Sequence, residues 1–324
     1  MEVVERHEPV WEDTRDAWRA GPTTALRLAR AELRLLRRPA GRFDAVIVGY
    51  PGHFDLPAAR RAARGAPVVF NPLVSLADTL VSDRARFRPG SLPARVLALV
   101  DRRALRAADV VVADTEQQAR FLTELAGLER VEVCFVGAEE RVFRPAPLGP
   151  FTHALFVGKL IPLHGLETIL EAARLAPDLP FRVVGSGQLD AQLGRRPGNV
   201  EWVPWVEYER LAGELHRAGA ALGIFGRSAK ASRVIPNKAF QALACGTPLV
   251  TADTPAAREL LVDGESALLV PAGDAHALAG ALQRLASDDA LRARIAAGGL
   301  SAYRRHASEE VLGRRWLSIL ERAQ

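Results

Sequence analysis

Short runs of β-branched and other apolar residues alternate with longer segments rich in Ala, Leu and Arg along the whole chain. In the first half this pattern predicts strands over 44–48, 67–70, 109–112 and 131–136. The segments between them have helical periodicity, most clearly over 94–107 and 116–126. Because strands that alternate with helices form parallel sheets covered by helices, the first half is predicted to be an α/β domain.

The same alternation restarts after a Pro- and Gly-rich segment, 143–150, which predicts a linker. In the second half, strands are predicted over 154–157, 181–184, 220–225, 248–251 and 267–270. Helices are predicted over 165–176, 208–218, 237–245, 275–286 and 289–298. The second half is therefore a second α/β domain.

The last segment, 309–323, has apolar residues at helical spacing, which favours packing in a core. These residues are Leu312, Trp316, Ile319 and Leu320. We predict two consecutive Rossmann-like domains, 1–146 and 147–305, and a helix over 306–324 that crosses back onto the first domain.

The first domain begins differently from the second. A nucleotide-type α/β domain begins with a strand, a Gly-containing turn and a helix. This chain instead begins with residues 3–6, which resemble a second strand. We expect the first domain to lack its first β-α unit, either because the true protein begins upstream of Met1 or because the domain is shorter.

Composition narrows the class of protein. The 324 residues are 48% hydrophobic and 25% charged, which is typical of a soluble globular protein of two domains. No apolar run is long enough to span a bilayer, and Cys134 and Cys245 lie far apart in apolar contexts. These features predict a cytoplasmic protein with no disulfide and no metal site.

The charge favours an anionic partner, because the net charge is +5 and the pI is near 9.7. Nucleic acid is not expected, since aromatic residues make up 6% of the chain and no nucleic-acid-binding signature is present. A nucleotide, a phosphorylated substrate or an anionic membrane surface fits the same charge.

Lysine is rare and clustered. Three of the 43 Lys and Arg residues are Lys, namely Lys159, Lys230 and Lys238, and all lie in the second half. Lys provides a compact point charge where Arg provides a planar fork. Lysines in or beside candidate phosphate-binding segments therefore indicate function, although the codon usage of a GC-rich genome would also produce this ratio.

The first candidate motif covers 156–166. A strand leads into Gly158, a turn carries Lys159, and Gly165 begins a helix. Backbone N–H groups at a helix start, with a Lys nearby, form an anion site. The alternative is a plain βα turn whose glycines serve its geometry.

The second candidate motif covers 235–250. Pro236 and Asn237 are typical of a helix start, and Lys238 adds positive charge to the positive end of the helix. That charge is unfavourable unless an anion is bound, which indicates function. Gln241 shares a face with Lys238 and is suited to bond a pair of hydroxyls, although a surface helix with solvated Lys and Gln is the alternative.

Several segments, in order, resemble the retaining GT-B glycosyltransferases of the family-4 (group 1) type over nearly all of 137–305. The matching segments are 143–145 with Gly137, 156–160 with 164–165, 184–187, 242–250, 259–264 and 270–274, and 107–115 in the first half. The resemblance implies a GT-B fold, in which a nucleotide-sugar donor bound by the second domain faces an acceptor domain across a cleft. The nucleotide sugar is then a co-substrate, and no cofactor is implied.

The resemblance also implies roles for individual residues. A basic pair that holds the diphosphate corresponds to Lys159 and His164, where the family usually has Arg and Lys. Two glutamates that grip the donor sugar and the ribose correspond to Arg233 and Gln241, so Arg233, together with Lys238, is predicted to hold phosphates or an acidic sugar instead. The remaining donor-binding positions are Gly158, Gly185, Ser186, Gly187, Pro236 and Asn237.

The family retains anomeric configuration without an obvious protein nucleophile, and the leaving diphosphate helps to take the proton of the acceptor. We therefore expect Lys159 and Lys238 to stabilise charge on the leaving phosphate. His53 is the nearest substitute for a catalytic His of the first domain, with a structural role as the alternative. Asp78 and Asp83 are candidates for the acceptor side.

A basic amphipathic helix is predicted from Leu26 to Arg38. Such a helix can lie on an anionic membrane, which would suit a lipid-linked acceptor and a peripheral position on the inner membrane face. The alternative is a packed surface helix with solvated arginines.

The leading hypothesis is an enzyme that moves a hexosyl-type sugar from a nucleoside diphosphate to a hydroxyl acceptor, with retention. The acceptor is a glycan, a lipid-linked sugar or a small molecule. A second hypothesis is a catalytically degenerate GT-B protein that is a partner or activator of an active transferase. The missing first unit and the absent glutamate pair favour it, whereas an epimerase of similar fold fits the motifs less well. The sequence does not predict the base, the sugar or the oligomeric state.

Overall fold

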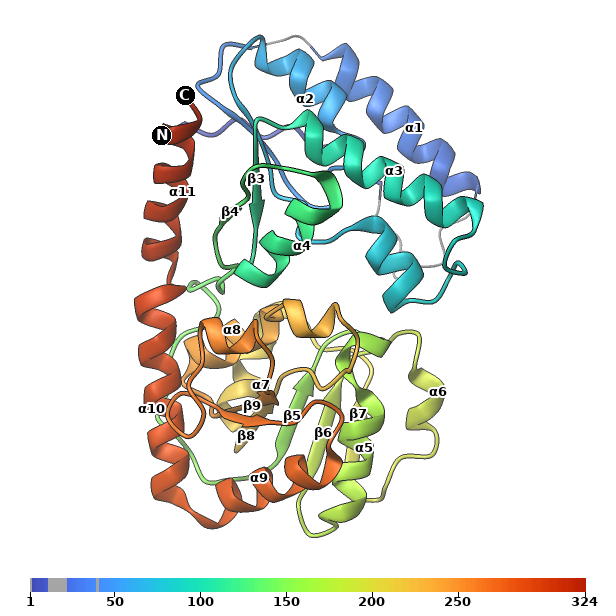
Figure 1. Ribbon diagram of the computed structural model, residues 1–324. Coiled ribbons are helices and arrows are strands. Elements are labelled where there is room, and N and C mark those ends of the chain that lie inside the picture. The colour runs from blue at the N-terminus through green and yellow to red at the C-terminus, as the bar shows by residue number, and fades with distance from the viewer. Residues whose placement is uncertain (1, 11–21, 39–40) are drawn as a thin grey trace.

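The computed structural model describes residues 2–10, 22–38 and 41–324, and it confirms an α/β fold of two Rossmann-like domains (Figure 1). In the first domain, the described strands form one parallel sheet in the order β1-β2-β3-β4. Its strands are β1 (Val46–Val48), β2 (Val68–Phe70), β3 (Val110–Ala113) and β4 (Glu132–Val133). Its helices are α1 (Pro22–Arg37), α2 (Leu56–Ala63), α3 (Leu92–Ala107) and α4 (Glu116–Ala126).

The second domain has a parallel sheet in the order β10-β9-β8-β5-β6-β7. Its strands are β5 (Ala154–Val157), β6 (Phe181–Val184), β7 (Val200–Val203), β8 (Ala220–Leu222), β9 (Leu249–Ala252) and β10 (Leu268–Val270). Its helices are α5 (Leu166–Leu175), α6 (Asp190–Leu193), α7 (Leu211–Arg217), α8 (Asn237–Cys245) and α9 (Ala275–Ser287). The direction of strand order reverses between β5 and β8, and α/β sheets bind ligands beyond the carboxyl ends of their strands at such a point.

Two long helices end the chain, α10 (Asp289–His306) and α11 (Glu309–Ala323), and they run along one side of both domains (Figure 1). On α11, Ile319 is fully buried against Val69, Val112 and Cys134 of the first domain. This helix therefore packs on the first domain although it follows the second in sequence.

Side-chain caps set where several helices begin. The hydroxyl of Thr115 accepts a hydrogen bond from the backbone N–H of Gln118 and begins α4. Gly246, with a positive φ of 69°, ends α8 in the left-handed conformation that glycine adopts most readily. These signals are local in sequence, which explains why the start of α4 and the end of α8 could be predicted.

The beginning of the chain differs from the prediction. Residues 3–6 form no strand, and Val3 and Val4 are 75% and 57% exposed. The nearby Glu8 is instead tied to Arg38 at the end of α1, with a 2.5 Å contact between Nη2 and Oε1. Among the described residues β1 is an edge strand of its sheet, and Met1, where a preceding unit would attach, lies outside them.

Other elements were missed or misjudged in length. The strand β7 and the helix α2 were not predicted, and α10 runs eight residues beyond its predicted end at 298. Predicted strands over 131–136 and 220–225 are shorter in the structure. Within the described part of the chain, the helices include none long and apolar enough to cross a membrane.

Candidate functional site

Glycines join the two loops at the carboxyl ends of β5 and β6. The Gly158 N–H donates to the carbonyl of Val184 at 2.9 Å, and the Leu160 N–H donates to that of Ser186 at 3.2 Å. A Cβ on Gly185, where φ is +138°, would lie 2.0 Å from the carbonyl oxygen of Gly158. The backbones therefore approach so closely that no side chain fits between them.

The predicted basic pair is divided between an exposed and a buried residue. Lys159 is exposed at this edge, as is Ser186, while His164 is 8% exposed with its ring edge-on to Phe156. The His164 Nδ1 donates to the carbonyl of Lys159 at 2.5 Å. Burial and the neighbouring Lys238 hold the pKa of His164 well below its ordinary value. The imidazole is therefore uncharged, and only Lys159 of the predicted pair offers a charge.

Lys238 lies in the first turn of α8 with its nitrogen enclosed. Its Nζ is 3.8 Å from the centroid of the Phe156 ring and has no hydrogen-bond partner among the described residues. A Cβ on Gly158 would lie 2.9 Å from this nitrogen. Burial holds the pKa of the ammonium well below its ordinary value, although the stem of the side chain is partly exposed. A lysine nitrogen without a partner is thus placed directly against the Gly158 turn.

Two further predicted residues, Pro236 and Asn237, lie at the start of α8, and Gln241 lies one turn further along the helix. Asn237 is exposed and Pro236 is half-buried, and together they begin α8. Gln241 hydrogen-bonds the hydroxyl of Tyr208. Lys238 and Gln241 both line one small pocket, which agrees with the prediction that they share one face of the helix.

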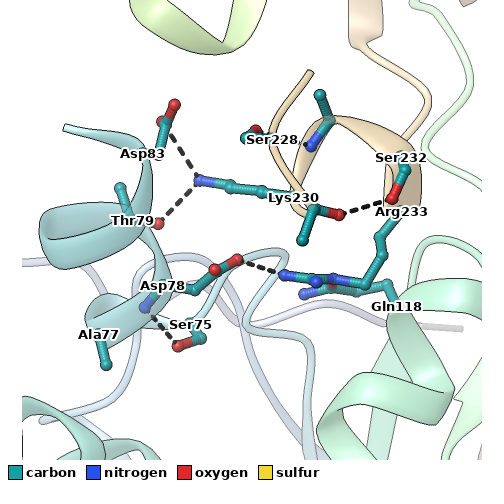
Figure 2. Close-up of polar contacts among 12 residues, drawn as sticks. Ser75, Ala77, Asp78, Thr79, Asp83, Gln118, Ser228, Lys230, Ser232 and Arg233 are labelled. Atoms are coloured by element: carbon teal, nitrogen blue, oxygen red, sulfur yellow. Dashed lines mark hydrogen bonds and ion pairs between the residues drawn. The ribbon is translucent and has the colours of Figure 1, made fainter. Parts of the chain in front are cut away.

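Arg233 and Lys230 both contact the first domain (Figure 2). The Arg233 Nη2 donates to Asp78 Oδ2 at 2.7 Å, and its guanidinium lies 4.0 Å from the centroid of the Phe121 ring. The Lys230 Nζ donates to the Thr79 hydroxyl at 2.9 Å and lies 3.7 Å from Asp83 Oδ2. Where the sequence predicted a cleft, these described side chains bridge the domains.

The first-domain partners lie on a π-helical segment, η2 (Asp78–Asp83). Burial raises the pKa of Asp83, although Lys230 opposes the shift. Burial likewise lowers the pKa of Lys230, with Asp83 opposing. The two side chains are almost fully buried, so each depends on the other for charge compensation. Arg233 is engaged by Asp78 rather than directed at a free anion.

His53 is buried beneath this segment. Its Nε2 lies 3.2 Å from Asp101 Oδ1, and its Nδ1 contacts the carbonyl of Pro51. The Asp101 carboxylate also accepts hydrogen bonds from Ser75 Oγ at 2.7 Å and from the backbone N–H groups of Leu76 and Ala77 at 2.8 and 2.9 Å.

Burial opposes ionisation of Asp101, but the adjacent His53 and the hydrogen bonds from Ser75 and the backbone keep its pKa below the ordinary value. The ionised carboxylate thus holds the turn that leads into η2. His53 is 5% exposed, and this placement favours its structural interpretation over contact with a substrate.

Three more residues lie at the contact between the two domains and were not assigned to a site from the sequence: Asp114, Thr115 and Glu259. The Thr115 hydroxyl donates to the Arg233 carbonyl at 2.5 Å, and Glu259 accepts from the N–H groups of Glu116 and Gln117 at the start of α4. Burial and the nearby Glu259 raise the pKa of Asp114 to about 7. The available signal was the position of Asp114 and Thr115 shortly after the strand predicted over 109–112.

Two family models cover the two domains. One, described as a glycosyl transferase 4-like domain, matches residues 3–139, and the other, described as glycosyl transferase-like, matches residues 164–321. The chain is similar to a D-inositol 3-phosphate glycosyltransferase of Nocardioides sp., with 30% identity over 326 positions, 89% of this chain and 69% of that protein. It is also 35% identical to a phosphatidyl-myo-inositol mannosyltransferase of Mycobacterium leprae over 162 residues, 47% of this chain and 42% of that protein.

Solved structures share the fold. Sucrose-phosphate synthase from Thermosynechococcus elongatus superposes with a TM-score of 0.73 at 18% identity, over 94% of this chain and 82% of the other. HepE of Anabaena, solved with UDP and glucose, gives a TM-score of 0.70 at 17% identity, over 93% and 83%. The chain therefore belongs to the group 1 family of glycosyltransferases and has the two-domain GT-B fold.

Proposed function

We propose that this chain transfers a hexosyl group from a nucleoside-diphosphate sugar to a hydroxyl acceptor, with retention of anomeric configuration. One observation carries the proposal: the Lys238 nitrogen is enclosed and unpartnered against the backbone of Gly158. Burying an amine without a hydrogen-bond partner is costly, and an anion at the Gly158 turn would offset that cost by binding the protonated form. A diphosphate between this turn and the exposed Lys159 meets the requirement.

The proposed reaction uses these groups electrostatically. The bond between the anomeric carbon and the diphosphate oxygen breaks while a bond to the acceptor oxygen forms on the same face. The acceptor proton passes to the leaving diphosphate oxygen. Lys159, and Lys238 once protonated, stabilise the charge that builds on this oxygen. His164 is uncharged and is assigned no charge-stabilising role.

Thermal shift measurements against UDP, GDP, ADP and dTDP test the donor site. One nucleotide should raise the Tm of the native chain, and Lys238→Met should abolish that rise. The same variant should itself melt at a higher temperature than the native chain without nucleotide, because it removes a buried unpaired amine. A variant that is destabilised but still responds to the nucleotide would contradict the assignment.

Turnover tests the reaction. Release of the nucleoside diphosphate from its sugar conjugate would be followed with D-inositol 3-phosphate as the first acceptor, because a relative is named for it. NMR of the product then gives the anomeric configuration. Inversion would overturn the proposed stereochemistry and leave the donor site standing.

A second candidate function is a noncatalytic partner of an active transferase. Arg233 and Lys230 are already bound to carboxylates of the same chain, which favours this alternative. A cooperative melt that responds to no nucleotide, together with co-purification of an active transferase, would support it over the enzyme.

A further inference from the structure

The helix α3 exposes large aliphatic side chains on one face. Leu92, Val96 and Leu99 follow one another at intervals of four and three residues and are 75%, 50% and 46% exposed. The opposite face of the same helix buries Ala104 and Leu105 in the core of the first domain. The helix is therefore fixed by its inner face and leaves an outer apolar stripe unused.

Arginines flank the same stripe. Arg95, Arg102 and Arg103 are exposed, and in the described part of the chain none of their side chains makes a hydrogen bond or an ion pair. Asp101 is the only carboxylate of α3, and it is buried on the other side of the helix. The outer face thus combines aliphatic surface with uncompensated positive charge.

A groove of about 430 Å³ lies at the C-terminal end of this face. It is lined by Leu99, Arg102, Arg103 and Arg106 of α3 and by Glu124, Leu125 and Gly127 at the end of α4. Arg106 is anchored there, because its Nε donates to the carbonyl of Ala126 at 2.7 Å. Arginine side chains dominate the polar lining, so the groove suits a phosphate group.

The basic helix α1, predicted from sequence as the membrane contact, is less available. It also exposes Leu26 and Leu33. However, Arg34 and Arg38 are within 3.7 and 2.5 Å of the carboxylate of Glu8, so part of its charge is neutralised inside the chain. Compared with α1, the helix α3 has more described arginines that make no hydrogen bond or ion pair beside its exposed apolar residues.

We propose that the outer face of α3, with the arginine-lined groove at its end, docks on the surface of an anionic lipid bilayer. Leu92, Val96 and Leu99 enter the boundary between headgroups and acyl chains, while the arginines contact lipid phosphates. Nucleic acid would satisfy the arginines but offers no apolar phase for the aliphatic stripe. The proposal is independent of whether the chain transfers sugar.

Sedimentation with vesicles tests the docking. The native chain should bind vesicles of equimolar phosphatidylcholine and phosphatidylglycerol, and not phosphatidylcholine alone. The variant R95Q/R102Q/R103Q should lose affinity on the order of a hundredfold, at about 1 kcal/mol per arginine. The variant L92S/V96S/L99S should lose at least about tenfold. All six positions are on the exposed face, and far-UV circular dichroism confirms that each variant is folded.

Two matched controls locate the surface. R304Q/R305Q removes exposed charge from α10, and R30Q/R37Q removes exposed charge from α1; both should bind nearly as the native chain does. Docking through α3 is overturned if its variants bind normally or if binding follows the α1 variant. It is equally overturned if L92S/V96S/L99S binds normally while a DNA duplex competes fully, since that identifies a general polyanion site.

Discussion

The two sheet edges that face each other across the domains are held in shape by different means. In the second domain, backbone meets backbone, and Gly185 is required because a Cβ there would collide with the carbonyl of Gly158. In the first domain, a buried side chain is the organiser, since Asp101 accepts hydrogen bonds from Ser75 and from the turn before η2 and lies 3.2 Å from His53 Nε2. One edge is thus specified by the absence of side chains and the other by a single carboxylate.

The two edges also carry opposite charges. Lys230 and Arg233 come from the second domain, and Asp78 and Asp83 come from the first (Figure 2). The faces are electrostatically complementary without any ligand. An anionic donor that used either cation would therefore have to compete with the chain's own carboxylates.

Removal of the first-domain organiser should have the largest effect. Asp101→Ala leaves buried donors without an acceptor, and we expect a loss of about 3–5 kcal/mol in the free energy of unfolding of the first domain. Hydrogen–deuterium exchange should rise over 75–83 before it rises elsewhere. Chemical denaturation together with exchange mass spectrometry measures both.

Asp109 provides a matched control. It also accepts three hydrogen bonds, two from Arg60 and one from the Val68 N–H, but its side chain is 40% exposed. Asp109→Ala should cost only about 1 kcal/mol, because water can replace the lost partner. Equal losses for the two variants would mean that Asp101 is not the organiser.

Disruption of the backbone contact between Gly185 and Gly158 should cause the second-largest loss of stability. Gly185→Ala requires an unfavourable backbone conformation and displaces the Gly158 carbonyl, for an expected loss of about 2–4 kcal/mol. Any nucleotide-induced rise in Tm should disappear with it. Gly280→Ala is the control, since nothing lies within 4 Å of its Cβ in the middle of α9, and it should stabilise by about 1 kcal/mol. A Gly185→Ala chain with native stability would remove the basis for the backbone-built edge.

The sequence predicted the glycine-built edge far better than the carboxylate-built one. Gly158 was assigned to the site because it follows a predicted strand, and Gly185 and Gly187 were assigned through the family resemblance, whose motifs are local in sequence. Asp101 lies within a helical pattern, where an acidic residue is indistinguishable from a solvated one. The pairing of Arg233 with Asp78 joins residues 155 positions apart, and it depends on how two folded domains dock. The enclosure of the Lys238 nitrogen likewise depends on the Phe156 ring of another element.

The pH dependence of stability should identify Asp114, a buried acid at the first-domain edge. Its pKa is raised to about 7, so between about pH 4 and 7 the folded chain holds a proton that the unfolded chain has released. The stability is fully present at low pH and is lost as the pH rises through 7. Asp114→Asn removes this loss, and its advantage over the native chain should grow by about 2–3 kcal/mol between pH 5 and pH 8. Denaturant titration at both pH values measures it, and a constant difference would contradict burial of the charge.

The smallest expected effect is the coupling between Asp78 and Arg233, and it tests the charge comparison directly. A double-mutant cycle with Asp78→Asn and Arg233→Gln should give about 1–2 kcal/mol. The Glu171–Arg174 pair has the same 2.7 Å separation, but its side chains are 51% and 49% exposed, against 9% and 16% for Asp78 and Arg233. Its coupling should be only about 0.3–0.5 kcal/mol, because water screens it. Since the distances are equal, any excess at the domain boundary is due to burial. Equal couplings would mean that burial does not strengthen the ion pair between Asp78 and Arg233, and that this pair contributes little to holding the domains together.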